Sequence, residues 1–156
     1  MTDDALMDAA LEQAASAALA GEVPVGAVAV VGGEIIATGF NQPISSTDPT
    51  AHAEIVAIRA AARRLGNYRL TEVSLYVTLE PCLMCVGALV HARVKAVVYG
   101  AAEPRTGALV SSLRALETPG LNHRFEVRSG VREEACRELI QQFFQARRRP
   151  GREAGL

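Results

Sequence analysis

The chain has 156 residues, of which 49% are hydrophobic and 21% are charged, and its formal net charge is −1. This length predicts a single domain over residues 1–156 with enough apolar side chains for a full core, and the absence of a long apolar run argues against a membrane span. Acidic residues interrupt the first nineteen positions, so we expect no secretory signal and predict a cytoplasmic protein without membrane contact.

Helical and strand patterns alternate along the chain. Residues 3–20 are rich in alanine and predict a helix that Gly21 ends, and Gly32-Gly33 joins two strand-like segments as in a tight hairpin. Apolar residues at helical spacing in 54–65 predict a helix, and Asp48-Pro49-Thr50 just ahead of it predicts a turn and a helix cap. The expected order is a helix at 3–20, strands at 25–31 and 34–40, a helix from about 52 to 65, a strand at 74–78, a helix at 82–92, strands at 94–99 and 124–128, and a helix at 131–149. The last residues, about 150–156, are expected to form a flexible polar tail.

This order of elements predicts an α/β fold with three layers, α/β/α, in which helices cover both faces of a mixed central sheet of about five strands. The connection through the 82–92 helix is expected to make the strands on either side of it parallel. The closing helix is amphipathic, and we expect one of its faces to pack on the core; this face contains Cys136, Leu139, Ile140, Phe143 and Phe144.

The most specific pattern is His52-Ala53-Glu54, followed thirty residues later by Pro81-Cys82-Leu83-Met84-Cys85. One imidazole and two thiols at this spacing predict three zinc ligands, His52, Cys82 and Cys85, with a fourth position open to water. Zinc with three protein ligands lowers the pKa of its water from about 15.7 towards about 7, so hydroxide is available at neutral pH. We therefore expect one Zn²⁺ per chain and hydrolytic catalysis.

Glu54 is the predicted catalytic acid and base. It follows His52 by two residues, so it can lie beside the metal without binding it, accept a proton from the water, protonate a ring nitrogen and help the amine leave. Cys82 and Cys85 share one face of the predicted helix, and Pro81 is expected in its first turn. The unpaired N–H groups at a helix start favour thiolates, which are the form of cysteine that binds zinc.

Each part of this pattern has a simpler explanation when it occurs alone. A Cys-x-x-Cys pair is also typical of redox sites and of structural zinc sites, and a single histidine is more often structural than a ligand. A structural zinc site needs a fourth ligand, for which Cys136, His91 and His123 are the remaining candidates, none at close spacing. Cys136 has no partner left for a disulfide, which fits a reducing compartment, and we expect it to be buried on a helix.

From Glu22 to about Arg149 the chain resembles the tRNA-specific adenosine deaminases, which convert the wobble adenosine of a tRNA anticodon to inosine. The metal residues alone would also fit cytidine, guanine or riboflavin-pathway deaminases. The resemblance extends much further, through EVPVGAV (22–28), GFNQP (39–43), DPTAHAE (48–54), NYRL (67–70), YVTLEPCLMC (76–85), GAL (87–89), YGA (99–101), TGA (106–108) and NHR (122–124). It implies a cytidine-deaminase-like fold, a homodimer, and a tRNA anticodon stem-loop as the partner.

The resemblance also implies which residues bind the substrate. Asn41 is expected to read the base through its amide, although an asparagine after a strand is also a common turn former. Val23 and Pro24 are expected to form an apolar wall against the base, or else are simply buried at the start of a strand. Asn122 and His123 are expected to line the mouth of the pocket near the anticodon loop, or else serve as capping and turn residues.

Glu103 departs from the family pattern, because the bacterial enzymes usually have aspartate at this position. Its loop follows a strand end beside the zinc, where the aspartate of the family approaches the sugar of the flipped nucleotide. The extra methylene of Glu103 is expected to shift this contact and to leave the metal and proton chemistry intact. Arg105, in the same loop, is expected to contact a phosphate.

Charge is distributed unevenly along the chain. Residues 1–58 contain eight acidic residues and no Lys or Arg, whereas residues 59–156 contain all sixteen basic residues and nine acidic ones, so the two parts have charges of −8 and +7. Affinity for phosphates depends on local charge, so we expect the RNA backbone to contact Arg147, Arg148 and Arg149, with Arg152 nearby. A basic run at a helix end is also commonly just a solvated surface.

These observations predict zinc-dependent deamination of the wobble adenosine, in which hydroxide attacks C6, Glu54 protonates N1, ammonia leaves and inosine remains. Two alternatives stay open. A free-base or nucleoside deaminase acting on guanine or cytidine would not need the basic C-terminal region, and a noncatalytic zinc-stabilised RNA-binding subunit would not need Glu54. Gly87, Ala88 and Ala92 are small enough for close packing of a second copy, which internal packing would explain equally well.

Overall fold

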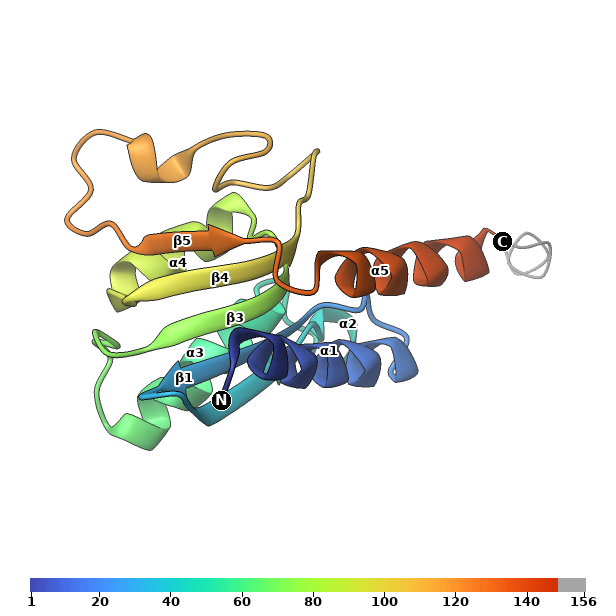
Figure 1. Ribbon diagram of the computed structural model, residues 1–156, viewed down its shortest axis with the longest axis horizontal. Helices are drawn as coiled ribbons and strands as arrows, with labels where there is room; N and C mark the ends of the chain where they lie inside the picture. The colour runs from blue at the N-terminus through green and yellow to red at the C-terminus, as the bar shows by residue number, and fades with distance from the viewer. Residues whose placement is uncertain (149–156) are drawn as a thin grey trace.

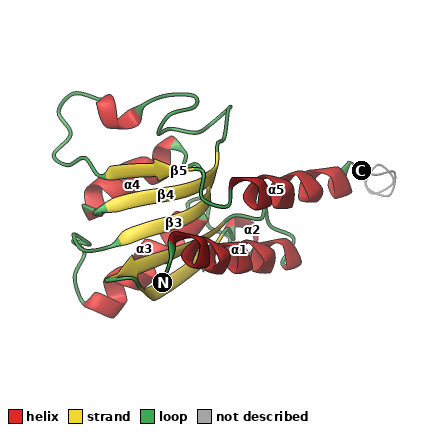
Figure 2. Ribbon diagram, viewed as in Figure 1, coloured by secondary structure: helices red, strands yellow, loops and turns green. Residues whose placement is uncertain are grey.

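The computed structural model describes residues 1–148; residues 149–156, which include Arg149, Arg152 and the predicted tail, lie outside the described part of the chain. A five-stranded sheet forms the middle layer, and helices cover both of its faces (Figure 1 and Figure 2). The strands are β1 (Gly26–Val31), β2 (Glu34–Phe40), β3 (Ser74–Leu79), β4 (Ala96–Ala101) and β5 (Glu126–Ser129). The helices are α1 (Asp3–Leu19), α2 (Pro43–Ser46), α3 (Ala53–Leu65), α4 (Leu83–Ala92) and α5 (Glu133–Arg147), with a short 3-10 turn, η1 (Ala115–Glu117).

The sheet is mixed, with the strand order β2-β1-β3-β4-β5. β1 is antiparallel to β2 and β3, whereas β3, β4 and β5 run parallel, and α4 makes the crossover from β3 to β4. Both glycines of the β1–β2 hairpin, Gly32 and Gly33, have positive φ, as a tight hairpin turn requires. The predicted α/β/α architecture is confirmed, and the ends of the predicted elements are displaced by no more than two residues.

Two apolar layers hold the helices to the sheet. Successive strand residues alternate between the layers because side chains point to opposite faces of a sheet. Leu75 and Val97 belong to the larger layer, beneath α3 and α4. Tyr76 and Val98 belong to the smaller one, beneath α1 and the start of α5. The chain therefore has the core on both sheet faces that an α/β/α domain needs.

Glycines allow two helices to lie unusually close to the hairpin strands. A Cβ atom on Gly26 would lie 2.0 Å from the carbonyl oxygen of Ala10, so α1 rests directly on the start of β1. A Cβ atom on Gly39 would lie 2.6 Å from the backbone nitrogen of Ala57 and 2.7 Å from the carbonyl oxygen of Ala53. The first turns of α3 are thus pressed against the end of β2.

β2 contains a β-bulge at Ile36. Ala29 pairs with Ala37 and Val30 pairs with Ile35, which leaves Ile36 without a partner on β1. The carbonyl oxygen of Ile36 instead accepts a hydrogen bond of 3.0 Å from Nη1 of Arg64, near the end of α3. The side chain of a helix therefore satisfies the carbonyl that the bulge takes out of the ladder.

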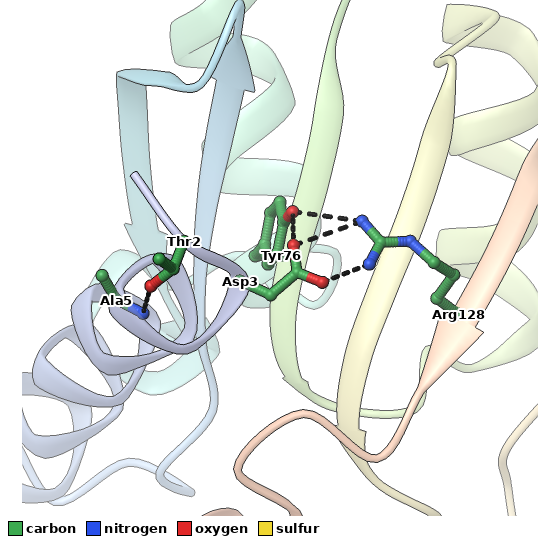
Figure 3. A network of polar contacts seen from close by, with 5 residues as sticks. All are labelled: Thr2, Asp3, Ala5, Tyr76 and Arg128. Carbon is green, nitrogen blue, oxygen red and sulfur yellow. Dashed lines mark hydrogen bonds and ion pairs between the residues drawn. The ribbon is translucent and has the colours of Figure 1, made fainter.

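A polar network joins the start of α1 to β3 and β5 (Figure 3). The Tyr76 hydroxyl donates to Oδ1 of Asp3 at 2.5 Å, and the Arg128 guanidinium forms an ion pair with Asp3 and donates to the Tyr76 hydroxyl at 3.2 Å. The Thr2 hydroxyl caps the helix by accepting the N–H of Ala5 at 3.1 Å. These contacts fix α1 on the face of the sheet opposite α3 and α4.

α5 packs on the sheet over only part of its length. Cys136 is buried, whereas Leu139, Ile140 and Phe143 are half-buried and Phe144 is 37% exposed. The helix extends past the end of the strands (Figure 1), so its second half has no sheet beneath it. The prediction that Phe144 faces the core is therefore wrong. Within residues 1–148, no helix is both long and apolar enough to cross a membrane.

Candidate metal centre and active site

The predicted zinc ligands lie at one edge of the sheet, where β3 ends and β1 begins. α3 and α4 both start at this edge: His52 is the N-cap of α3, Cys82 is the N-cap of α4, and Cys85 lies in the first turn of α4. Two helix starts therefore flank the predicted metal ligands. The predicted place of Pro81 in the first helical turn is wrong, because the extended cap conformation of Cys82 puts Pro81 ahead of the helix.

The three ligand atoms have the spacing of a tetrahedral zinc site. Nδ1 of His52 lies 3.5 Å from Sγ of Cys82 and 3.5 Å from Sγ of Cys85, and all three atoms lie within 4.8 Å of one another. Zinc bonds of about 2.0–2.1 Å to nitrogen and about 2.3 Å to sulfur, at a tetrahedral angle, place the two donor atoms about 3.5 Å apart. The donor set therefore fits one zinc ion per chain.

The other candidate ligands lie elsewhere. Cys136 belongs to the apolar layer on the opposite face of the sheet, next to Gly100. His91 lies in the last turn of α4, and His123 contacts the backbone at the far end of β4. Within residues 1–148, no other His, Cys, Asp or Glu forms a metal-binding group with these three ligands, so the fourth position is open to water or substrate.

The contact between the two thiols shifts the pKa values of both in opposite directions. A hydrogen bond from the Cys85 thiol lowers the pKa of Cys82 to about 4. The same contact, together with burial, raises the pKa of Cys85 above its usual range. The hydrogen bond with Cys82 also raises the pKa of His52. A divalent cation replaces these protons, because zinc binds thiolate sulfur and neutral imidazole.

Glu54 is buried beside the ligands. It occupies the second position of α3 and is 4% exposed. Burial is the main cause that raises the pKa of Glu54 to about 7, against the opposing effects of a backbone hydrogen bond and of the charge on His52. A carboxyl group with a pKa near neutrality can accept a proton and return it at physiological pH, which is what a general acid and base must do.

A cavity of about 210 Å³ opens beside these groups. Its other walls contain Val23, Val25, Asn41, Leu79, Glu80 and Thr106. Two residues predicted to bind substrate, Val23 and Asn41, are thus brought next to Glu54. Pro24 is buried and does not line the cavity, because successive side chains of an extended segment point in opposite directions.

The sequence did not identify Glu80 and Thr106 as site residues. Glu80 directly precedes the Pro81-Cys82 pair after a buried strand, and a carboxylate at such a place is the signal that could have identified it. Burial alone would raise the pKa of Glu80, but hydrogen bonds from Ser111, Val110 and Glu103 together hold the pKa below its usual value. Glu80 is therefore a buried anion in the wall of the cavity.

Glu103 and Arg105 lie beside this cavity and not inside it. They border a second cavity of about 440 Å³ between the loop after β4 and α5, and Leu79 borders both cavities. The backbone N–H of Arg105 donates to Oε1 of Glu103 at 2.9 Å, and the Arg105 side chain is exposed. The longer glutamate side chain thus folds back on its own loop.

Asn122 and His123 lie away from the cavity in the single chain. His123 is half-buried, and its Nε2 lies 2.7 Å from the carbonyl oxygen of Val94. Val94 precedes β4, whereas the zinc ligands lie beyond the opposite end of the neighbouring parallel strand β3. The prediction that these two residues line the pocket mouth is therefore wrong for the single chain, and His123 serves to hold a loop.

Arg147 and Arg148 end α5 on the exposed side of the molecule. The Arg147 guanidinium donates to the carbonyl oxygen of Gly21 at 2.7 Å and lies 4.5 Å from the centre of the Phe143 ring. Arg147 and Phe143 border a hollow of about 230 Å³ that shares Val23 and Asn41 with the catalytic cavity. Arg148 is exposed, and Arg149 lies outside the described residues.

Residues 1–101 match the model of the cytidine and deoxycytidylate deaminase zinc-binding region. The chain is 48% identical to a tRNA-specific adenosine deaminase of Haemophilus influenzae over 94% of its own length and 85% of the relative.

Solved structures show the same relationship. The chain matches a structure from a study of A-to-I editing by tRNA:A34 deaminases at the wobble position, with a TM-score of 0.84 and 44% identity over 86% of this chain and 97% of that one. It also matches a guanine deaminase from Bacillus subtilis, with a TM-score of 0.63 and 46% identity over 65% of this chain and 66% of that one. The cytidine-deaminase-like fold is thereby confirmed.

Proposed function

Because this chain belongs to the tRNA-specific adenosine deaminases within the cytidine and deoxycytidylate deaminase family, we propose that it hydrolyses the wobble adenosine of a tRNA anticodon to inosine and ammonia. The observation that supports this proposal most strongly is the buried Glu54 carboxyl beside His52, Cys82 and Cys85 in a cavity that an unpaired base can enter.

His52, Cys82 and Cys85 would hold the zinc ion, which would supply a Lewis acid that activates water for attack on an amidine carbon. Glu54 accepts the proton of that water. It passes this proton to N1 of the purine ring. It then takes the second proton from the new hydroxyl group on C6 and gives it to the departing amine, so that its carboxyl returns to its starting form. Burial keeps the carboxyl from exchanging its proton with bulk water between the two transfers.

Two features next to the cavity suit an RNA substrate. The Asn41 amide can donate to and accept from a purine edge, and Val23 offers an apolar surface against the base. Arg147 and Arg148, with the exposed Arg105 on the loop after β4, add positive charge around this edge of the sheet. Basic side chains around a pocket for one splayed base are what recognition of an anticodon loop requires.

The direct test is incubation of the purified zinc protein with a set of tRNA transcripts, with inosine detected by sequencing. Glu54→Ala should keep one zinc per chain and lose at least about a hundredfold in the rate of inosine formation, because general acid–base catalysis contributes at least this much. Cys82→Ser should instead lose the metal. Zinc content measured by emission spectroscopy separates the two outcomes, and near-normal turnover by Glu54→Ala would remove Glu54 from its proposed role.

Guanine deamination is the second candidate function, because the chain also matches a guanine deaminase over about two thirds of both chains. Free guanine, adenosine and cytidine belong in the same assay. Turnover of guanine with no inosine in any tRNA would favour this candidate. A noncatalytic RNA-binding subunit would bind the transcripts and release no ammonia from any of these substrates.

We also propose a homodimer and, because tRNA is the substrate, a cytoplasmic location. A hollow of about 230 Å³ lies between α3 and α4. Ile58, Ala62 and Leu70 border it together with Arg59, His91 and Tyr68, which is 73% exposed. Tyr68→Lys should lower the sedimentation coefficient of the dimer towards that of the monomer, since it would bury a second positive charge beside Arg59. Leu19→Lys is the matched control, because Leu19 is 91% exposed at the end of α1.

A further inference from the structure

Glu80 holds the loop that follows β4. Its side chain is 3% exposed and both carboxylate oxygens accept hydrogen bonds from residues 103–111. Oε2 accepts the backbone N–H groups of Leu109, Val110 and Ser111 at 2.8–3.1 Å. Oε1 accepts the backbone N–H of Glu103 at 3.1 Å and the Ser111 hydroxyl at 2.5 Å. A single side chain thus binds both ends of this loop.

These contacts require a carboxylate. An ionised carboxylate only accepts hydrogen bonds and can serve all five donors, whereas a glutamine of the same shape has one oxygen and one NH₂ group. If the glutamine oxygen accepts the N–H groups of Leu109, Val110 and Ser111, the glutamine NH₂ group faces the backbone N–H of Glu103. Both of these groups are donors, so no hydrogen bond forms between them. The Ser111 hydroxyl can rotate and accept. Glutamine at position 80 therefore releases the Glu103 end of the loop selectively.

The loop that Glu80 holds forms part of the catalytic edge. Thr106 lines the catalytic cavity, and Glu103 and Arg105 border the neighbouring one. The backbone N–H of Ala108 donates 2.8 Å to the carbonyl oxygen of Pro81, the residue before the ligand Cys82. A Cβ atom on Gly107 would lie 2.4 Å from the carboxyl carbon of Glu80, so the loop backbone lies directly against the carboxylate.

We propose that Glu80 is a positioning residue for the nucleic-acid substrate: by holding residues 103–111, it keeps Thr106, Glu103 and Arg105 in the arrangement that receives the target nucleotide. This inference rests on the proposed function, since it assigns these residues to the substrate of that reaction. The hydrogen bonds of the Glu80 carboxylate go to this loop and not to the metal ligands or Glu54, so we expect Glu80 to act on substrate binding more than on proton transfer.

The test uses full-length zinc-loaded Glu80→Gln and an anticodon stem-loop transcript. We expect KM to rise by about tenfold and kcat to fall by less than about threefold, with zinc still at one ion per chain. Amide exchange followed by NMR should become at least about tenfold faster at Glu103 and change much less at Val110 and Ser111. Ser111→Ala removes one donor and leaves the charge, so it should raise KM by about two- to threefold; it also serves as the test if Glu80→Gln does not fold.

Asp3→Asn is the control for a general loss of stability, because Asp3 lies in the network on the other face of the sheet. It should lower the melting temperature and leave KM unchanged. An unchanged KM in Glu80→Gln with faster exchange at Glu103 would overturn the proposal, as would loss of zinc together with kcat, or an equal rise of KM in Asp3→Asn. If the wild type does not deaminate the stem-loop, the proposed function is wrong. The role of Glu80 is then decided by the same comparison of KM on whichever of adenosine, guanine or cytidine the wild type deaminates.

Discussion

A substitution at Gly39 tests how closely α3, the helix that begins after His52, packs against the sheet. In Gly39→Ala, the added Cβ atom would lie 2.6 Å from the backbone nitrogen of Ala57 and 2.7 Å from the carbonyl oxygen of Ala53. Backbone atoms cannot rotate away as a flexible side chain can. Relief to an ordinary contact requires the first turns of α3 to shift by roughly 0.8 Å relative to β2.

This shift has two measurable costs. Overpacking of this kind lowers the free energy of unfolding by about 1–3 kcal/mol, which corresponds to a fall in melting temperature of about 3–10 °C for a domain of this size. Ala53 lies between His52 and Glu54, so the displaced turn also moves a zinc ligand. Metal–ligand distances tolerate changes of only about 0.2 Å, and we expect the zinc affinity to fall by about ten- to a hundredfold.

The assay combines a thermal melt of the zinc protein with competition for zinc against a chelator of known affinity. Thr38→Ile is the matched control, because it adds bulk to the exposed neighbour of Gly39 on the same strand. It should leave zinc affinity unchanged. A Gly39→Ala protein with the melting temperature and zinc affinity of the wild type would refute the reasoning, and a lower melting temperature with unchanged zinc affinity would show that β2 yields instead of α3.

Three further variants test other parts of the fold by thermal melts. Asp3→Asn removes the network in Figure 3 and should cost at most about 1 kcal/mol, since Asp3 and Arg128 are both more than a third exposed. The hydrogen bond from Arg128 is the main cause that lowers the pKa of Asp3. The difference in stability between the wild type and Asp3→Asn should therefore persist above the ordinary pKa of 3.8 and shrink as the pH falls below it. A difference that stays constant with pH would contradict this cause. Arg93→Gly should stabilise the chain by about 1 kcal/mol, because Arg93 ends α4 with a φ of 59°, and a lower melting temperature would show that its side chain is needed. Gly87→Ala should add about 0.5–1 kcal/mol, because an added Cβ meets nothing within 4 Å; destabilisation only at concentrations where dimers form would place Gly87 in the dimer contact.

The sequence predicted the elements well because their signals are local. Gly32-Gly33 marked the hairpin, helical spacing after His52 marked α3, and the thirty-residue separation of His52 from Cys82 allowed two helix starts to meet at one metal. These signals depend on residues a few positions apart, or on ligand chemistry that few residue types can satisfy. The α/β/α layers then followed from the order of the elements.

The sequence did not predict contacts that depend on where distant loops fold. Glu80 gathers donors that lie 23 to 31 residues further along the chain, and no periodic pattern marks them. The exposure of Phe144 depends on how far α5 extends beyond the strands, which its amphipathic pattern does not encode. The resemblance implies a place at the pocket mouth for His123, whereas its position at the far end of β4 follows from the parallel direction of β3 and β4.

The bulge at Ile36 protects an edge strand against aggregation with other copies of the protein. An outer strand with a regular row of free N–H and C=O groups can template β-aggregation. In β2 the bulge makes the strand irregular, and the Arg64 side chain lies against it through its hydrogen bond to the carbonyl oxygen of Ile36. The opposite border, β5, has only four residues, among them Glu126 and Arg128. Both edge strands, β2 and β5, are therefore poor templates for pairing with a strand of another copy. Ordered assembly of copies is then expected to use the helical faces.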